Sequence, residues 1–212
     1  MTGFSPRPVR SAWVSLVAAF VGGAAMGIAA KLADQSGIAG VSDLGTYFGL
    51  WIVVATLIAA WSRSRQLAAL RVGAFMLAMV AAYYLVTLWL FAIFPVSQFL
   101  TWGAAAVLLT PLFAVLTWPS RQQGWLPAFA AALPIGMLLA EAYSFRWVLP
   151  NHLFQFMLDI GSAAMLFAVL PRSGAQRVRV LAVTPPAFLV AIGFMDLLPY
   201  VAGALRGVGL RL

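Results

Sequence analysis

The sequence has no cysteine, a single histidine and very few charged residues. Of its 212 residues 8% are charged, with 5 acidic residues against 13 basic ones. The lack of cysteine excludes disulfides, thiolate metal ligands and thiol catalysis, and one histidine, His152, excludes a site built from several histidines of one chain. A soluble domain carries about 25% charged residues, so this chain lacks the side chains that a water-exposed surface requires.

Apolar residues make up most of the chain. Hydrophobic residues account for 64% of it, and its mean hydropathy is +0.99. Apolar stretches of about 18 residues or more with few charges are typical of membrane-spanning helices. We therefore predict an all-α integral membrane bundle, one domain over residues 1–212, in the lipid bilayer of the bacterial cytoplasmic (inner) membrane.

The net charge of +8 does not indicate nucleic-acid binding. The basic residues form short clusters between apolar runs instead of one patch, which is the pattern that orients membrane helices. If the N-terminus is cytoplasmic, nine basic residues lie on the inner side and four on the outer side. The positive-inside rule therefore predicts a cytoplasmic N-terminus and an external C-terminus.

Seven transmembrane helices are predicted from the apolar runs. The first run is longer than the apolar part of a signal peptide, so we expect it to remain as the first helix. The seventh helix has an alternative start after "TPPAF" (184–188), which would make it 187–206. The predicted spans are 13–31, 44–61, 69–94, 99–118, 125–145, 153–170 and 181–203.

Small residues recur four positions apart on the first and third predicted helices. This spacing lets helix backbones approach closely in a membrane, where no hydrophobic effect drives helices together. We interpret it as packing within the bundle in preference to a dimer interface. Two prolines, Pro111 and Pro134, lie inside the fourth and fifth helices and favour kinks there. The small residues are Ala19, Gly23 and Gly27, followed by Ala74, Ala78 and Ala82.

The charged residues inside the predicted spans gather toward the outer side. Glu141 and Asp159 lie in the outer halves of the fifth and sixth helices, and Asp196 in that of the seventh. Lys31 ends the first helix outside, and Arg146 occupies an external loop. Ionisable groups within the membrane usually face a bundle interior or a water-filled cavity and indicate function. The alternative is structural, with Glu141 paired to Lys31 or Arg146.

These residues predict an outward-facing polar site that binds or transports a small solute, either polar or cationic. Tyr83 and Tyr84 are further candidates for lining it, or else they bond across helices as ordinary core tyrosines. The alternative function is a non-catalytic membrane subunit that assembles with partner proteins. The motifs of hydrolases, metalloenzymes and phosphate-binding loops are missing, so we expect neither enzymatic activity nor a cofactor.

Four segments between residues 47 and 145 have a distinctive series of apolar and aromatic residues. They are "YFGLWIVVATLIAAWSRS", "AAYYLVTLWLFAIFP", "WGAAAVLLTPLFAVLTW" and "ALPIGMLLAEAYSF". Together they resemble an uncharacterised family of bacterial multi-pass membrane proteins, a domain-of-unknown-function family. The resemblance implies a helical bundle in the inner membrane and implies nothing about chemistry.

Overall fold

The computed structural model describes residues 10–38, 40–44 and 47–207, and within these ranges it is helical, without strands. A four-residue helical turn, α2 (Val41–Leu44), lies between the first two long elements, and short 3-10 turns follow α5 and α6 at 118–121 and 145–147. The longer helices are α1 (Arg10–Asp34), α3 (Phe48–Ala60), α4 (Arg65–Phe91), α5 (Val96–Thr117), α6 (Trp125–Ser144), α7 (Leu149–Val169) and α8 (Gly174–Gly207).

Six of these helices, α1 and α4 to α8, are long and apolar enough to cross a membrane. They confirm the predicted all-α membrane bundle. The second predicted span, 44–61, is wrong in its length, because α3 has only 13 residues. At 1.5 Å per residue α3 is about 20 Å long, against about 30 Å for the hydrocarbon core of a bilayer. Apolar composition alone cannot distinguish a short buried helix from a span, since both are hydrophobic all round.

The last helix also differs from its prediction. Both proposed starts are wrong, because α8 begins at Gly174 and continues through Pro185 and Pro186 to Gly207. The polar stretch at its start resembled a loop, and the two prolines resembled a helix start. Prolines are tolerated within membrane helices when neighbouring helices support the backbone. Gly136 of α6 lies against α8 just after the prolines, where an added Cβ would come within 2.8 Å of the Ala187 backbone.

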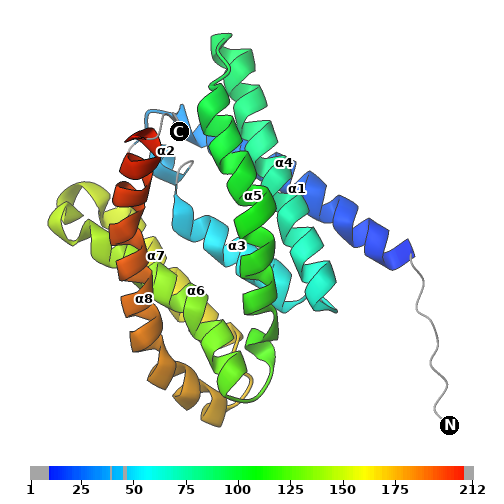
Figure 1. Ribbon diagram of the computed structural model, residues 1–212, viewed down its shortest axis with the longest axis vertical. Coiled ribbons are helices and arrows are strands. Elements are labelled where there is room, and N and C mark those ends of the chain that lie inside the picture. The colour runs from blue at the N-terminus through cyan, green and yellow to red at the C-terminus, as the bar shows by residue number, and fades with distance from the viewer. Residues whose placement is uncertain (1–9, 39, 45–46, 208–212) are drawn as a thin grey trace.

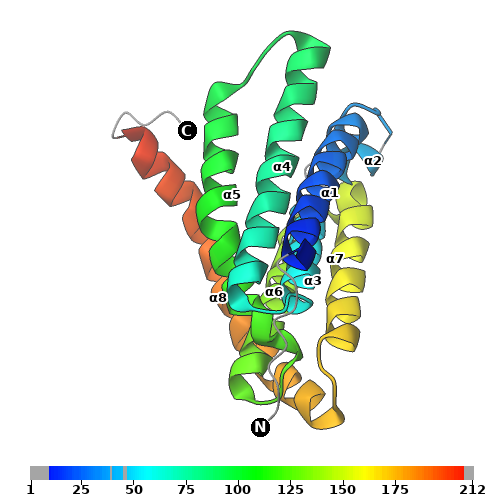
Figure 2. The same cartoon turned by 90° about the vertical axis from the view of Figure 1, so that its right-hand side faces the viewer.

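The helices form two groups with α3 between them. The first group contains α1, α4 and α5, and the second contains α6, α7 and α8 (Figure 1). Figure 2 shows α1, α4 and α5 lying alongside one another. α3 crosses the middle of the molecule and contacts α4, α5, α6 and α7. The short helix is therefore the main bridge between the two groups.

Each group has a hydrophobic core of its own, and α3 contributes to both. Ala55 and Ala59 on α3 belong to the core of the first group, together with buried residues of α1, α4 and α5. Ile52 and Val53 on α3 belong to the core of the second group. Two faces of one 13-residue helix are thus buried against different partners, which explains why α3 is apolar all round.

Glycines bring α1 close to α4, as the spacing of small residues predicted. A Cβ at Gly23 would overlap the backbone carbonyl of Phe75, and a Cβ at Gly27 would overlap that of Met79. The Cβ at Gly27 would also lie 3.1 Å from the Cβ of Ala82. The small faces of the two helices therefore meet each other within one chain, and the interpretation as packing inside the bundle is confirmed.

The connections α3–α4, α5–α6 and α7–α8 lie at one end of the molecule, at the bottom of Figure 2. This end is rich in arginine, and two of these side chains stack on tryptophans: Arg121 lies 3.8 Å from the ring centre of Trp61, and Arg65 lies 5.4 Å from that of Trp118. Gln176 on α8 is fully buried and exchanges two hydrogen bonds with the backbone of Gly124, at 3.0 and 3.1 Å. That this basic end faces the cytoplasm stays a prediction.

Candidate acidic site between α3, α6 and α7

The start of α3 brings a tyrosine and a glycine against Asp159 of α7. Tyr47, the extended residue before α3, is 4% exposed, and its hydroxyl donates to Oδ1 of Asp159 at 2.5 Å. A Cβ at Gly49 would overlap both Asp159 Oδ1 and the Tyr47 hydroxyl. Glycine at position 49 is therefore what lets the Asp159 carboxylate lie directly against the first turn of α3.

Glu141 reaches the same place from α6. It lies in the last turn of that helix, is 9% exposed, and accepts from the backbone N–H of Phe48 at the start of α3. Asp159, which is completely buried, is close enough to act on it electrostatically. Within the described residues neither carboxylate forms an ion pair with a basic side chain. The structure thus brings together two of the acids that the sequence singled out.

Three side-chain oxygens of this region have no hydrogen-bond partner among the residues that the structure describes. They are Oε2 of Glu141, Oδ2 of Asp159 and Oε1 of Gln155, all of them buried. Gln155 is 3% exposed and lies one helical turn before Asp159, on the same face of α7. We call this set of residues, Tyr47, Gly49, Glu141, Gln155 and Asp159, the acidic site.

His152 lies two turns before Asp159 on α7. The predicted span 153–170 begins just after it, but α7 begins at Leu149 and departs from helical geometry at His152 itself. Its ring stacks on Phe145 at 5.2 Å, and its buried Nδ1 has no partner among the described residues. The departure from helical geometry therefore separates the first residues of α7 from the regular part that carries Gln155 and Asp159.

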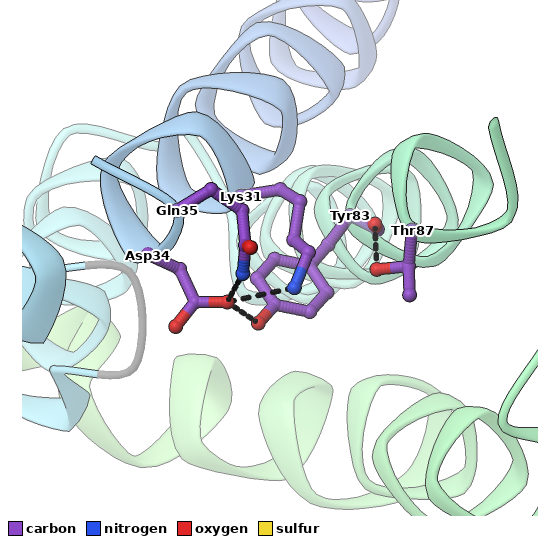
Figure 3. A network of polar contacts seen from close by, with 5 residues as sticks. All are labelled: Lys31, Asp34, Gln35, Tyr83 and Thr87. Atoms are coloured by element: carbon purple, nitrogen blue, oxygen red, sulfur yellow. Dashed lines mark hydrogen bonds and ion pairs between the residues drawn. The ribbon is translucent and has the colours of Figure 1, made fainter. Parts of the chain in front are cut away.

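Lys31 does not pair with Glu141 but belongs to a separate network between α1 and α4 (Figure 3). Its Nζ lies 2.7 Å from Oδ2 of Asp34, and the same oxygen accepts from Gln35 and from the Tyr83 hydroxyl, each at 3.0 Å. Lys31 also lies over the Tyr83 ring, 5.0 Å from its centre. Three donors converge on one carboxylate oxygen, so this network ties α1 to α4 and leaves Lys31 already neutralised.

The remaining predicted site residues lie elsewhere. Arg146 is exposed, donates to the carbonyl of Tyr143 at 2.8 Å, and stacks on the ring of the same residue. Asp196 is exposed on α8. Tyr84 is 6% exposed and packs edge-on against neighbouring aromatic rings, including Phe99 at 5.8 Å. None of these three contacts the acidic site through an interaction seen in the described residues.

A cavity of about 770 Å³ lies between the two groups of helices. We call it the central cavity. Phe48 and Trp51 of α3 form one wall, and the buried indole N–H of Trp51 has no acceptor among the described residues. Phe48 separates the cavity from the acidic site, because its side chain lines the first while its backbone N–H contacts Glu141. The other walls include Tyr83, Tyr84, Trp102, Met137, Ala191 and Phe194.

Residues 6–201 match a family whose description is "Family of unknown function" (DUF6518). The chain belongs to the DUF6518 family. The DUF6518 match extends well beyond residues 47–145, over which the sequence resembled an uncharacterised family, and it includes the acidic site and the whole lining of the central cavity. No curated protein and no solved structure matches the chain.

Sequence reasoning missed three residues of the DUF6518 acidic site. Gln155 had a usable signal, because a polar side chain four positions before Asp159 shares its helix face. Tyr47 and Gly49 had no such signal. Both lie at the start of the predicted span 44–61, and nothing in the sequence indicated that the first turn of this helix would contact α7. Their contribution depends on the chain entering the bundle between two helix groups.

Proposed function

We propose that this DUF6518 protein is a carrier of the bacterial cytoplasmic membrane that binds a small solute in the central cavity. The observation that carries the proposal is the position of Phe48, which borders both the cavity and the acidic site. A solute against Phe48 therefore contacts the same residue that supports Glu141. Ionisable residues buried within membrane proteins mark substrate and ion pathways, and this arrangement joins such a pathway to a space of suitable size.

The architecture supports movement of the two groups about α3. Each group has its own core, and α3 packs against both. In many transporters the binding site lies at discontinuous helices, whose free ends point into the protein at mid-membrane depth. The short α3 matches this pattern, since its N-terminal turn faces Asp159, which is the middle residue of α7. Rocking of one group against the other would open the central cavity to alternate sides.

The lining of the cavity favours an uncharged solute with an apolar body. Eleven aliphatic and seven aromatic residues line it together with Gln98, and among the described residues no charged side chain does. The amide of Gln98, which is among the lining residues, supplies a hydrogen-bond donor, so a suitable solute carries a matching acceptor. This differs from the polar or cationic solute that the sequence suggested, because the acids lie behind Phe48 and do not border the cavity.

Solute binding is tested with a variant that fills the cavity. Ala191 lines it and is 6% exposed, whereas Leu189 lies two residues away on α8 and is 65% exposed outside it. A panel of uncharged aromatic ketones and amides is screened for compounds that raise the unfolding temperature of the purified protein. We expect the shift to persist in Leu189→Trp and to disappear in Ala191→Trp, because only the second indole occupies the cavity.

A compound that shifts both variants equally binds outside the central cavity. If no compound in the panel shifts the wild type, and none is taken up by proteoliposomes, the carrier proposal fails. The alternative, a non-catalytic membrane subunit whose buried acids are structural, would then be tested by isolating the protein with its partners.

The proposed orientation is tested with single cysteines, which the wild type lacks. Ser36 follows α1 at one end of the bundle, and Ala175 begins α8 at the other; both are exposed. In intact cells a membrane-impermeant thiol reagent is expected to label Ser36→Cys and not Ala175→Cys, because nine basic residues then face the cytoplasm. The reverse pattern of labelling would contradict the orientation.

A further inference from the structure

We propose that the acidic site binds one monovalent cation, either Na⁺ or a proton, between Glu141, Asp159 and Gln155. Glu141, Asp159 and Gln155 each hold one buried oxygen that has no hydrogen-bond donor among the described residues: Oε2, Oδ2 and Oε1, respectively. All are acceptors, and the ligand that satisfies several acceptors at once is a positive charge or a proton. The inference deepens the proposed function, since this cation would be the coupling ion of the carrier.

The charges at the site call for one cation. Two buried carboxylates that act on each other electrostatically need compensation, because an unpaired buried charge is strongly destabilising. The first turn of α3 supplies part of it, through the N–H of Phe48 on Glu141 and the partial positive charge of a helix N-terminus. Tyr47 contributes a neutral donor to Asp159. One bound cation lowers the net charge of the two carboxylates from −2 to −1, and the donors named above stabilise the charge that remains.

The ligand set favours a monovalent ion over a divalent one. Ca²⁺ takes six to eight oxygen ligands and usually several carboxylates. In the part of the chain that the structure describes, no three Asp, Glu, His or Cys side chains gather where they could hold a metal ion. Two carboxylate oxygens and one amide oxygen fall well short of that number and fit Na⁺ whose remaining ligands are water, or a shared proton.

The groups that would govern this binding come from every element around the site. Tyr47 precedes α3, Glu141 lies on α6, and α7 contributes Asp159 and, two turns earlier, His152. The backbone N–H of Phe48 donates to Glu141, and Phe48 also lines the central cavity. A cation at the acidic site would therefore fix the position of one wall of the cavity. This contact is the physical route by which cation and solute binding would be linked.

The test measures cation binding by the full-length protein without any solute. Thermal unfolding is followed in NaCl and in choline chloride at equal ionic strength, and infrared spectra are recorded near neutral pH to detect a buried protonated carboxyl group. We expect one of two results in the wild type: a saturable rise of the unfolding temperature with Na⁺, or a carboxyl C=O band that shifts in D₂O. The first identifies Na⁺ as the ion and the second identifies a proton.

Either signal is expected to vanish in Asp159→Asn and in Glu141→Gln and to persist in Asp196→Asn, which removes an exposed acid on α8. If one site variant does not fold, the other decides the assignment. A wild type that shows neither signal overturns the proposal, as does a signal that survives both site variants. Because no solute is present, failure here is distinct from failure of the cavity test, which leaves the acids unchanged.

Discussion

Replacing Gly49 with alanine is expected to disrupt the acidic site and to destabilise the protein by about 2–3 kcal/mol. The new methyl group would overlap Asp159 Oδ1 and the Tyr47 hydroxyl, both of which are held in place by packing. Either α3 shifts away from α7 or the hydrogen bond between Tyr47 and Asp159 breaks. The free energy of unfolding is measured by tryptophan fluorescence during denaturation in detergent, and cation binding by the thermal and infrared tests above.

Gly161→Ala is the matched control for Gly49→Ala. Gly161 lies on α7 only two residues after Asp159, but an added Cβ would meet nothing within 4 Å. Alanine in a helix interior is favoured over glycine by roughly 0.5–1 kcal/mol, so this variant is expected to keep or slightly gain stability and to bind the cation as the wild type does. A Gly49→Ala protein as stable as Gly161→Ala would contradict the close approach of α3 and α7.

The Gly23→Ala variant is expected to lose about 2–3 kcal/mol of stability through the contact between α1 and α4. Its methyl group would overlap the backbone carbonyl of Phe75, and backbone atoms of a helix cannot move aside as a flexible side chain can. The two helices must therefore separate along part of their length, which loses packing with Ala19 and its neighbours in the first core. Unfolding in a denaturing detergent titration measures the loss.

The neighbouring Gly22 provides the comparison for Gly23. A Cβ at Gly22 would lie 3.8 Å from the ring of Phe75, which is ordinary van der Waals contact. Gly22→Ala is thus expected to be neutral or slightly stabilising, although the composition of the two variants is identical. Equal effects of the two substitutions would show that α1 does not pack on α4 through the face that carries Gly23 and Gly27.

The two glycine positions also separate the roles of the helix groups. Gly23 holds together the first group, whereas Gly49 sits where α3 meets the second group. If the carrier works by rocking of the two groups, Gly23→Ala should lower the free energy of unfolding without altering cation binding. Gly49→Ala should lower both the free energy of unfolding and the affinity for the cation, because the cation site and the bridge between the groups share the first turn of α3.

Local composition was enough to establish the class of the protein, because runs of apolar residues long enough for a bilayer identify membrane spans without any tertiary information. The predicted depth of Glu141 and Asp159 in the membrane stays a prediction. Small residues at positions 19, 23 and 27 likewise indicated close packing, because this signal is carried by a single helix face. The start of the last helix was predicted wrongly, because its proline pair resembled a helix start and its polar first turn resembled a loop.

Which charged side chains lie close to one another depends on the tertiary structure. Lys31 pairs with Asp34, one turn away on its own helix. Glu141 of α6 instead lies near Asp159 of α7, which accepts a hydrogen bond from Tyr47, a residue that the sequence did not single out. Which faces of two helices meet depends on their order and rotation in the bundle. Helices that are apolar on all sides leave both unspecified, and the short α3, buried on two faces, could only be recognised once its neighbours were in place.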